Sequence, residues 1–255
     1  MFFFNKLLQT IFQIMVNRII ILLFVVFGST VYAQDALINA ELKQADRYTT
    51  LNNYTEALKH IENALDIEPL HIITLEKKVN IMIQAGKEKT LLKEIDNNID
   101  IYPQQPEYYY MRGLINMYRQ KYGKAVEDFL NADYYNMPEE AMEKIYFNRG
   151  TAYYYYGDFT KAEEDFKQAI QLNPRSATTY HSWGMLKYEQ GLFDDAIGYF
   201  NKAIQYEDNS GITYYNLGMA YYKIGELKDA CHNFNRACTF QNRSGCKIYY
   251  LECTE

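Results

Sequence analysis

Residues 146–174, YFNRGTAYYYYGDFTKAEEDFKQAIQLNP, determine the fold predicted for the whole chain. The small and aromatic residues of this stretch recur along the sequence in four columns, each with successive intervals of 37, 34 and 34 residues. The columns are Gly113, Gly150, Gly184 and Gly218; Ala125, Ala162, Ala196 and Ala230; Phe129, Phe166, Phe200 and Phe234; and Ala132, Ala169, Ala203 and Ala237. Four columns in one register indicate an internal repeat of about 34 residues.

The residue types in these columns predict that each repeat is a hairpin of two α-helices. Glycine or alanine at a contact lets two helix backbones approach closely, and a phenylalanine one turn later fills the adjoining space. Between the halves of a repeat stands a glycine, such as Gly157, Gly191 or Gly225, which is typical of a helix end. Pro174 ends one second helix, because proline cannot continue it.

These residues resemble the tetratricopeptide repeat. The fourth repeat departs from the family pattern at the leucine slot, which holds Arg149, and its matching residues are Tyr146, Gly150, Tyr153, Gly157, Phe159, Ala162, Phe166, Ala169 and Pro174. The resemblance implies an all-α fold, a right-handed α-solenoid of about six helical hairpins with a C-terminal capping helix. It also implies a protein that binds other proteins or peptides and is not an enzyme.

The repeat register divides the chain into three parts. Residues 1–33 are expected to be a signal peptide, 34–243 the repeat array and 244–255 a capping helix, with repeats at 38–71, 72–105, 106–142, 143–176, 177–210 and 211–243. The first repeat has Asn52 in place of its turn glycine. The second repeat is degenerate, because Leu91 and Asn98 replace its two core alanines. Looser packing or a hinge is predicted there.

The N-terminal 33 residues have the pattern of a secretory signal. They contain Lys6 and Arg18 but no acid, an apolar run at 19–27, and Val31 and Ala33 before the expected cut. An uncleaved anchor is the alternative, but a run of nine residues is short against the roughly 20 of a membrane-spanning helix. We therefore expect an exported protein, periplasmic or secreted, without stable membrane insertion after cleavage.

The charge of the chain argues against nucleic acid as a partner. Removing the two basic residues of the signal takes the formal net charge from −6 to −8. A chain with this negative balance repels a phosphate backbone.

The four cysteines lie in the last 25 residues, two on the second helix of the last repeat and two on the predicted capping helix. In antiparallel helices the numbers of facing residues have a constant sum. Both Cys231 with Cys253 and Cys238 with Cys246 add to 484. The pattern favours two nested disulfides across one seam, which export would allow. Buried free thiols and a zinc site remain alternatives, although the spacing is unlike the usual zinc pattern.

Tyrosine is unusually frequent, at 26 of 255 residues, and its runs fall on predicted first helices. In the family these helices line a concave groove. We expect an aromatic, methionine-rich groove that recognises a protein or peptide, with two asparagines bonding its backbone. The predicted groove residues are Tyr110, Met117, Phe147, Asn148, Tyr154, His181, Met185, Tyr188, Tyr215, Asn216, Met219 and Tyr222. The tyrosines expected in the core instead are Tyr109, Tyr146, Tyr153, Tyr180, Tyr214 and Tyr221.

No catalytic or cofactor motif is found. The sequence has neither a glycine-rich phosphate loop nor a nucleophile elbow. Glu56 with His60 and Asp229 with His232 are a helical turn apart, but two ligands alone rarely hold a metal. No enzyme, catalytic residue, metal or cofactor is therefore expected. The alternative functions are a carbohydrate- or small-ligand-binding accessory protein of the cell envelope and a purely architectural part of an envelope assembly.

Overall fold

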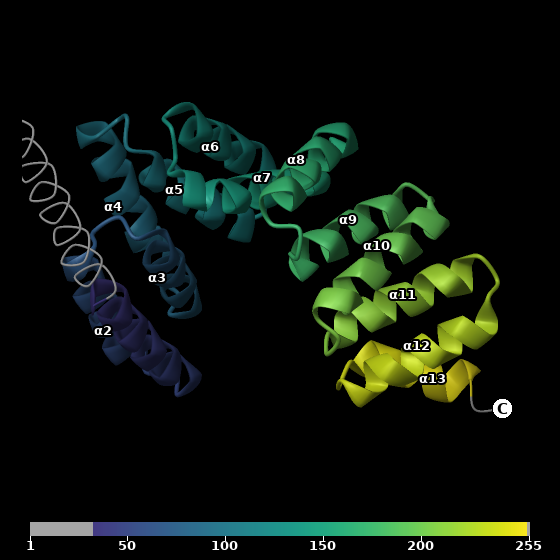
Figure 1. The fold of residues 1–255 in the computed structure, drawn as a ribbon. Helices are drawn as coiled ribbons and strands as arrows, with labels where there is room; N and C mark the ends of the chain where they lie inside the picture. The colour runs from purple at the N-terminus through teal and green to yellow at the C-terminus, as the bar shows by residue number, and fades with distance from the viewer. Residues whose placement is uncertain (1–32, 254–255) are drawn as a thin grey trace, which may run out of the picture. The chain divides into compact units, whose positions relative to one another are not determined.

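The computed structural model describes residues 33–253, and the regular structure in that range is helical (Figure 1). Residues 33–50 are helical, and the elements that follow are α2 (Tyr54–Ile67), α3 (Ile72–Gln84), α4 (Glu88–Ile101), α5 (Pro106–Tyr118), α6 (Tyr122–Tyr134), the 3-10 turn η1 (Glu139–Ala141), α7 (Met142–Tyr156), α8 (Phe159–Leu172), α9 (Ala177–Glu189), α10 (Phe193–Tyr206), α11 (Gly211–Lys223), α12 (Leu227–Thr239) and α13 (Arg243–Glu252). This order confirms the predicted all-α class of stacked helical hairpins.

The chain divides into two compact units, one ending at Leu91 and the other starting at Leu92. The boundary falls in α4, within the repeat predicted to be degenerate. In the first unit, helix 33–50 packs on α2 through Leu42, Ala45 and Ile61. Leu91 is fully buried although it replaces an alanine, so this repeat accommodates the larger side chain. The predicted repeat boundaries and the hinge stay predictions.

In the second unit, consecutive helices pack as four hairpins: α5 with α6, α7 with α8, α9 with α10, and α11 with α12 (Figure 1). The glycine and phenylalanine columns explain their close contact. A Cβ atom on Gly184 would lie 2.7 Å from the ring of Phe200, so only glycine leaves room for this ring. Phe200 is fully buried, as are the column alanines Ala162 and Ala169.

The hairpin turns follow from local residues. Gly157 ends α7 in the left-handed conformation, with φ of 93°. Asn52, predicted to replace the turn glycine of the first repeat, also has a positive φ, of 55°. Asp158 then begins α8 by accepting a hydrogen bond from the Lys161 N–H, at 3.2 Å. Pro138 precedes η1, in the connection between α6 and α7.

The leucine-slot arginine of the fourth repeat forms a buried ion-pair network. The Arg149 guanidinium donates to both oxygens of Asp165 on α8, at 2.8 Å each, and to Asp133 on α6, at 2.8 Å. Arg112 forms a similar network one repeat earlier, donating twice to Oδ1 of Asp128 and once to Asp96. Each arginine therefore ties its own hairpin to the preceding one, which explains why a charged side chain replaces the expected leucine.

The last described helix covers the end of the stack. α13 packs on α12, and a Cβ atom on Gly245 would lie 2.5 Å from the Ala237 methyl, so the two helices are in close contact. The cysteines join them as the pairs Cys231–Cys253 and Cys238–Cys246, with Cα atoms 5.6 and 4.3 Å apart. These are the two pairs that share the constant sum.

The predicted signal peptide lies outside the described residues, apart from Ala33. Within residues 33–253, no helix has both the length and the apolar character that crossing a membrane requires.

Candidate functional site

A cavity of about 240 Å³ opens among the first helices of three consecutive hairpins. It is lined by Thr151, Tyr154 and Tyr155 on α7, Phe166 on α8, His181, Ser182 and Met185 on α9, and Ile212 and Asn216 on α11. The lining contains no acidic residue, lysine or arginine. The cavity therefore presents aromatic and aliphatic surface with a few uncharged polar groups, which is the usual make-up of a site for an uncharged ligand.

Helical periodicity places these side chains together. Thr151 and Tyr155 are four residues apart on α7, and His181 and Met185 are four apart on α9. Residues at this spacing share one face of a helix. Helix α9 contacts both α7 and α11, so one face of each helix borders the same cavity.

A chain of hydrogen bonds holds the His181 side chain in the lining of this cavity. The Thr213 hydroxyl donates to the Ser210 hydroxyl, at 2.8 Å, and lies 2.9 Å from His181 Nδ1. Nδ1 must then carry the proton and donate to Thr213. The other nitrogen, Nε2, is left to accept from the Asn216 amide, at 3.5 Å. Burial lowers the pKa of His181 below its usual 6.5, so the imidazole is neutral at pH 7.

Several polar groups in the lining are left for a ligand. Among the described residues, neither the Tyr154 hydroxyl nor the Ser182 hydroxyl has a hydrogen-bond partner, and the Asn216 side-chain carbonyl has none either. Burial raises the pKa of Tyr154 to about 12, so its hydroxyl keeps its proton at neutral pH. The cavity thus offers two hydroxyls and one amide carbonyl, which match the donors and acceptors of a peptide backbone.

Four predicted groove residues line the cavity: Tyr154, His181, Met185 and Asn216. The remaining ones lie elsewhere on the first helices. Tyr188 packs edge-on against Phe193, Tyr222 is 45% exposed, and Met117 and Met219 are partly buried. A groove role for these residues stays a prediction.

Four predicted groove residues hold the same position in the four repeats of the second unit, and each covers the core phenylalanine of its own hairpin. The ring-centroid distances are 5.8 Å for Tyr110 and Phe129, 6.5 Å for Phe147 and Phe166, 5.6 Å for His181 and Phe200, and 6.1 Å for Tyr215 and Phe234. Side chains at this position therefore stabilise the hairpin, whether or not they also touch a ligand.

The prediction is wrong for Tyr110, which is fully buried and cannot contact a partner. Its hydroxyl accepts a hydrogen bond from the Asn148 amide, at 2.9 Å. The same amide nitrogen donates to the Lys144 carbonyl, also at 2.9 Å, so both donors of Asn148 are used within the protein. Asn148 therefore joins α7 to α5 and does not donate to a ligand backbone. The sequence had predicted that it would.

The separation of core tyrosines from surface tyrosines is largely confirmed. Tyr109, Tyr153, Tyr180 and Tyr214 are each 7 or 8% exposed, whereas Tyr146 and Tyr221 are only partly buried. The sequence missed Tyr155 and Ile212 as cavity residues. They are 56% and 50% exposed, and both are large hydrophobic side chains outside the core columns, which is the signal that could have found them.

The structure gives His60 another partner than the acid noted in the sequence. His60 lies 2.6 Å from Glu41 on helix 33–50, and the partner is therefore not Glu56. Across residues 33–253, no group of three or more histidine, cysteine, aspartate or glutamate side chains is arranged to hold a metal ion.

Comparison with known proteins finds matches to one protein family. Residues 143–176 match one family model described as tetratricopeptide repeat, and residues 181–243 match a second model with the same description. The human tetratricopeptide repeat protein 6 is 26% identical over 150 residues, which cover 59% of this chain and 28% of that protein. The mouse tetratricopeptide repeat protein 16 is 28% identical, over 54% of this chain and 27% of that protein. The chain thus spans about a quarter of the length of these two relatives.

Solved structures share the fold. PilW, a type IV pilus biogenesis factor, superposes with a TM-score of 0.66 at 17% identity, over 84% of this chain and 98% of PilW. YrrB, a repeat protein with an unusual peptide-binding site, superposes with a TM-score of 0.55 at 17% identity, over 75% of this chain and 98% of YrrB. At this identity the likeness concerns the fold alone.

Proposed function

Since this chain is a tetratricopeptide repeat protein, we propose that it is an interaction scaffold whose cavity on α7, α9 and α11 binds an uncharged segment of a protein or peptide. The single observation that carries the proposal is the lining. It combines aromatic and methionine surface with two hydroxyls and one amide carbonyl that have no hydrogen-bond partner among the described residues. Such groups supply contact area and backbone hydrogen bonds at low entropic cost.

The lack of charge in the cavity sets the class of segment. A lysine- or arginine-lined pocket would favour a carboxylate, but the charged form of an acid would lose its hydration here without gaining an ion pair. We therefore propose a segment with apolar and small polar side chains. The methionine of the lining, Met185, can adapt its shape to the apolar part of that segment.

The peptide-binding site of YrrB supports the same use of this fold, although it says nothing about the residues of this chain. We also propose that the protein is exported and works without catalysis. The pattern of the first 33 residues and the pairing of all four cysteines support export.

The proposal is tested by selecting binders from a displayed random peptide library with the purified protein. Binding of the selected peptide is then measured by calorimetry for the wild type, Tyr154→Ala, Met185→Ala and Tyr134→Ala. Tyr134 is 76% exposed on the second helix α6, so its variant is a matched control for loss of a tyrosine. We expect the two cavity variants to weaken binding about tenfold or more, and the control to leave it unchanged.

The groove proposal is wrong if the cavity variants and the control bind the selected peptide equally. A glycan array run with the same protein distinguishes the second candidate function. Tyr155 at the cavity is 56% exposed and could stack on a sugar ring, so glycan binding that Tyr155→Ala abolishes, without any peptide binder, would favour a carbohydrate-binding role.

A further inference from the structure

We propose that a second cavity, between α4, α5 and α6, binds a single oxyanion group, a phosphate or a carboxylate. The cavity has a volume of about 290 Å³. It is lined by Leu92 and Asp96 on α4, Arg112, Asn116 and Arg119 on α5, Lys121 before α6, and Lys124, Glu127 and Asp128 on α6. The charge in this lining contrasts with the uncharged cavity described above.

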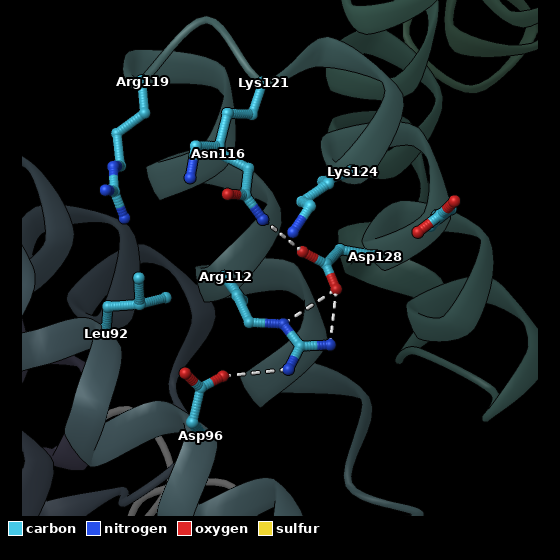
Figure 2. A pocket seen from close by; sticks show the side chains of 9 residues that line it. Leu92, Asp96, Arg112, Asn116, Arg119, Lys121, Lys124 and Asp128 are labelled. Carbon is cyan, nitrogen blue, oxygen red and sulfur yellow. Dashed lines mark hydrogen bonds and ion pairs between the residues drawn. The ribbon is translucent and has the colours of Figure 1, made fainter.

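The two aspartates of the cavity already have a partner. Figure 2 shows Arg112 between Asp96 and Asp128, and its guanidinium donates to Asp96 at 2.9 Å and to Asp128 at 2.7 Å. The Asn116 amide donates to the second oxygen of Asp128, at 2.8 Å. Both aspartate carboxylates are therefore paired with Arg112.

The other basic residues of the cavity are not neutralised in this way. Among the described residues, no carboxylate lies within ion-pair distance of Arg119, Lys121 or Lys124. Figure 2 shows these three side chains around the same cavity. With Arg112 and the three acids included, the lining carries four positive and three negative formal charges. A local excess of unpaired cations in a chain of net charge −6 favours an anionic ligand.

In the neighbouring hairpin the protein itself supplies a carboxylate for the lysine that corresponds to Lys124. In the repeat register, Lys121 and Lys124 correspond to Asp158 and Lys161 of the α7–α8 hairpin. There the Asp158 carboxylate accepts from the Lys161 backbone N–H and lies 3.3 Å from its ammonium group. At the start of α6 a lysine replaces that aspartate, so the positive charge is left for an external anion.

This cavity is independent of the proposed groove. The uncharged cavity is lined by residues of α7, α8, α9 and α11, whereas the charged cavity is lined by residues of α4, α5 and α6 and by Lys121 just before α6. The two linings have no residue and no helix in common. A ligand in one site does not occupy the other.

The size of the cavity limits the ligand. It is at the lower end of the range for small-molecule sites, roughly 300–1,000 Å³, and so suits one anionic group better than a whole cofactor. Lysine and arginine side chains donate to phosphate and carboxylate oxygens alike. A free phosphate and the acidic side chain of a partner are therefore the two sources to distinguish.

The test measures binding of inorganic phosphate, pyrophosphate and a hexaglutamate peptide by calorimetry at low ionic strength. The variant is Lys121→Gln with Lys124→Gln, both on exposed side chains. The matched control is Lys167→Gln with Lys228→Gln, which removes the same charge from exposed positions on α8 and α12. We expect at least one ligand to bind, about tenfold weaker in the variant and unchanged in the control.

Binding of phosphate or pyrophosphate alone identifies a free phosphate site, and binding of the peptide alone identifies an acidic partner. A third variant, Lys121→Asp, places a carboxylate where the neighbouring hairpin has Asp158. It should abolish binding, while circular dichroism shows that the helical fold is retained. The proposal is overturned if none of the three ligands binds at a concentration of about 10 mM. It is also overturned if the variant and the control weaken binding equally. Loss of the peptide-groove function would leave this result unaffected.

Discussion

Arg149 and Asp165 lie on the two helices of one hairpin and are joined by two hydrogen bonds of 2.8 Å, both buried. In the last hairpin the same two positions hold Leu217 and Asn233, without any charge. The fold therefore accepts a charged pair or an uncharged pair at this contact. What it should not accept is one half of the charged pair.

We predict that Arg149→Leu alone costs about 3–5 kcal/mol of unfolding free energy, because it leaves the Asp165 carboxylate buried without its cation. The double variant Arg149→Leu with Asp165→Asn reproduces the pair of the last hairpin and should recover most of that loss. Urea unfolding of the two single variants and the double variant measures the coupling. A double variant no more stable than Arg149→Leu would contradict this account.

Two glycines of one hairpin should respond oppositely to alanine. Gly184→Ala places a methyl group 2.7 Å from the Phe200 ring and should destabilise the protein by about 1–3 kcal/mol, despite the higher helix propensity of alanine. Gly198→Ala meets nothing within 4 Å in the middle of α10 and should stabilise it by about 0.5–1 kcal/mol. Thermal unfolding of both variants checks the pair, and a shift of the same sign in both would argue against close α9–α10 packing.

Stability should decrease in mildly acidic solution because of His181. Burial lowers the folded-state pKa of this histidine below 6.5, so the unfolded chain binds a proton at a higher pH than the folded one. The contribution of neutral His181 to the unfolding free energy is complete above pH 6.5. It is lost as the pH falls from 6.5 toward the lower folded-state pKa.

The measurement for His181 is the unfolding free energy as a function of pH, compared between wild type, His181→Gln and His232→Gln. The His181 variant should flatten the dependence below pH 6.5, because it removes the titrating group. His232 is exposed on α12, so His232→Gln controls for the loss of a histidine outside the cavity. An unchanged slope in the His181 variant would show that another group is responsible.

The two cysteine pairs should contribute unequally to stability. In the chain-entropy description a cross-link stabilises more when it closes a longer loop. Cys231–Cys253 spans 22 residues and Cys238–Cys246 spans 8. Replacing the outer pair with serines should cost about 3 kcal/mol, and replacing the inner pair about 1 kcal/mol less.

Intact mass and thermal unfolding check this prediction. The purified protein should be lighter than its reduced form by about four daltons, one for each hydrogen lost when two disulfides form. A reductant should lower the melting temperature of the wild type but not of a variant with serine at all four positions. A mass equal to that of the reduced form would support the free-thiol alternative.

Much of the fold could be predicted from the sequence, because the residues at the helix contacts recur at the same positions in every repeat of the second unit. The glycine, alanine and phenylalanine columns mark the contacts between helices, and glycine or asparagine at a turn marks a helix end. The constant sum of the cysteine positions anticipated the pairs that the structure brings together. These are local or periodic signals, and they need no knowledge of how one hairpin meets the next.

The site was only partly predictable, because its members are set by contacts between hairpins. Tyr110 and His181 occupy the same repeat position, yet Tyr110 is enclosed with its hydroxyl bonded to Asn148, whereas His181 borders a cavity. Tyr155 and Ile212 enter that cavity from positions that a single repeat gives no reason to choose. The basic cavity combines residues from three helices, and no motif in the sequence links them.

The sequence by itself determined the helical hairpin, its repetition and its turns, because those depend on spacing along one chain and on the size of side chains at close contacts. The tertiary structure alone decided which side chains stay open to a ligand and which charges stay unpaired. Exposure and charge neutralisation depend on residues from neighbouring hairpins, as when Asp133 and Asp165 meet around Arg149 from two different helices.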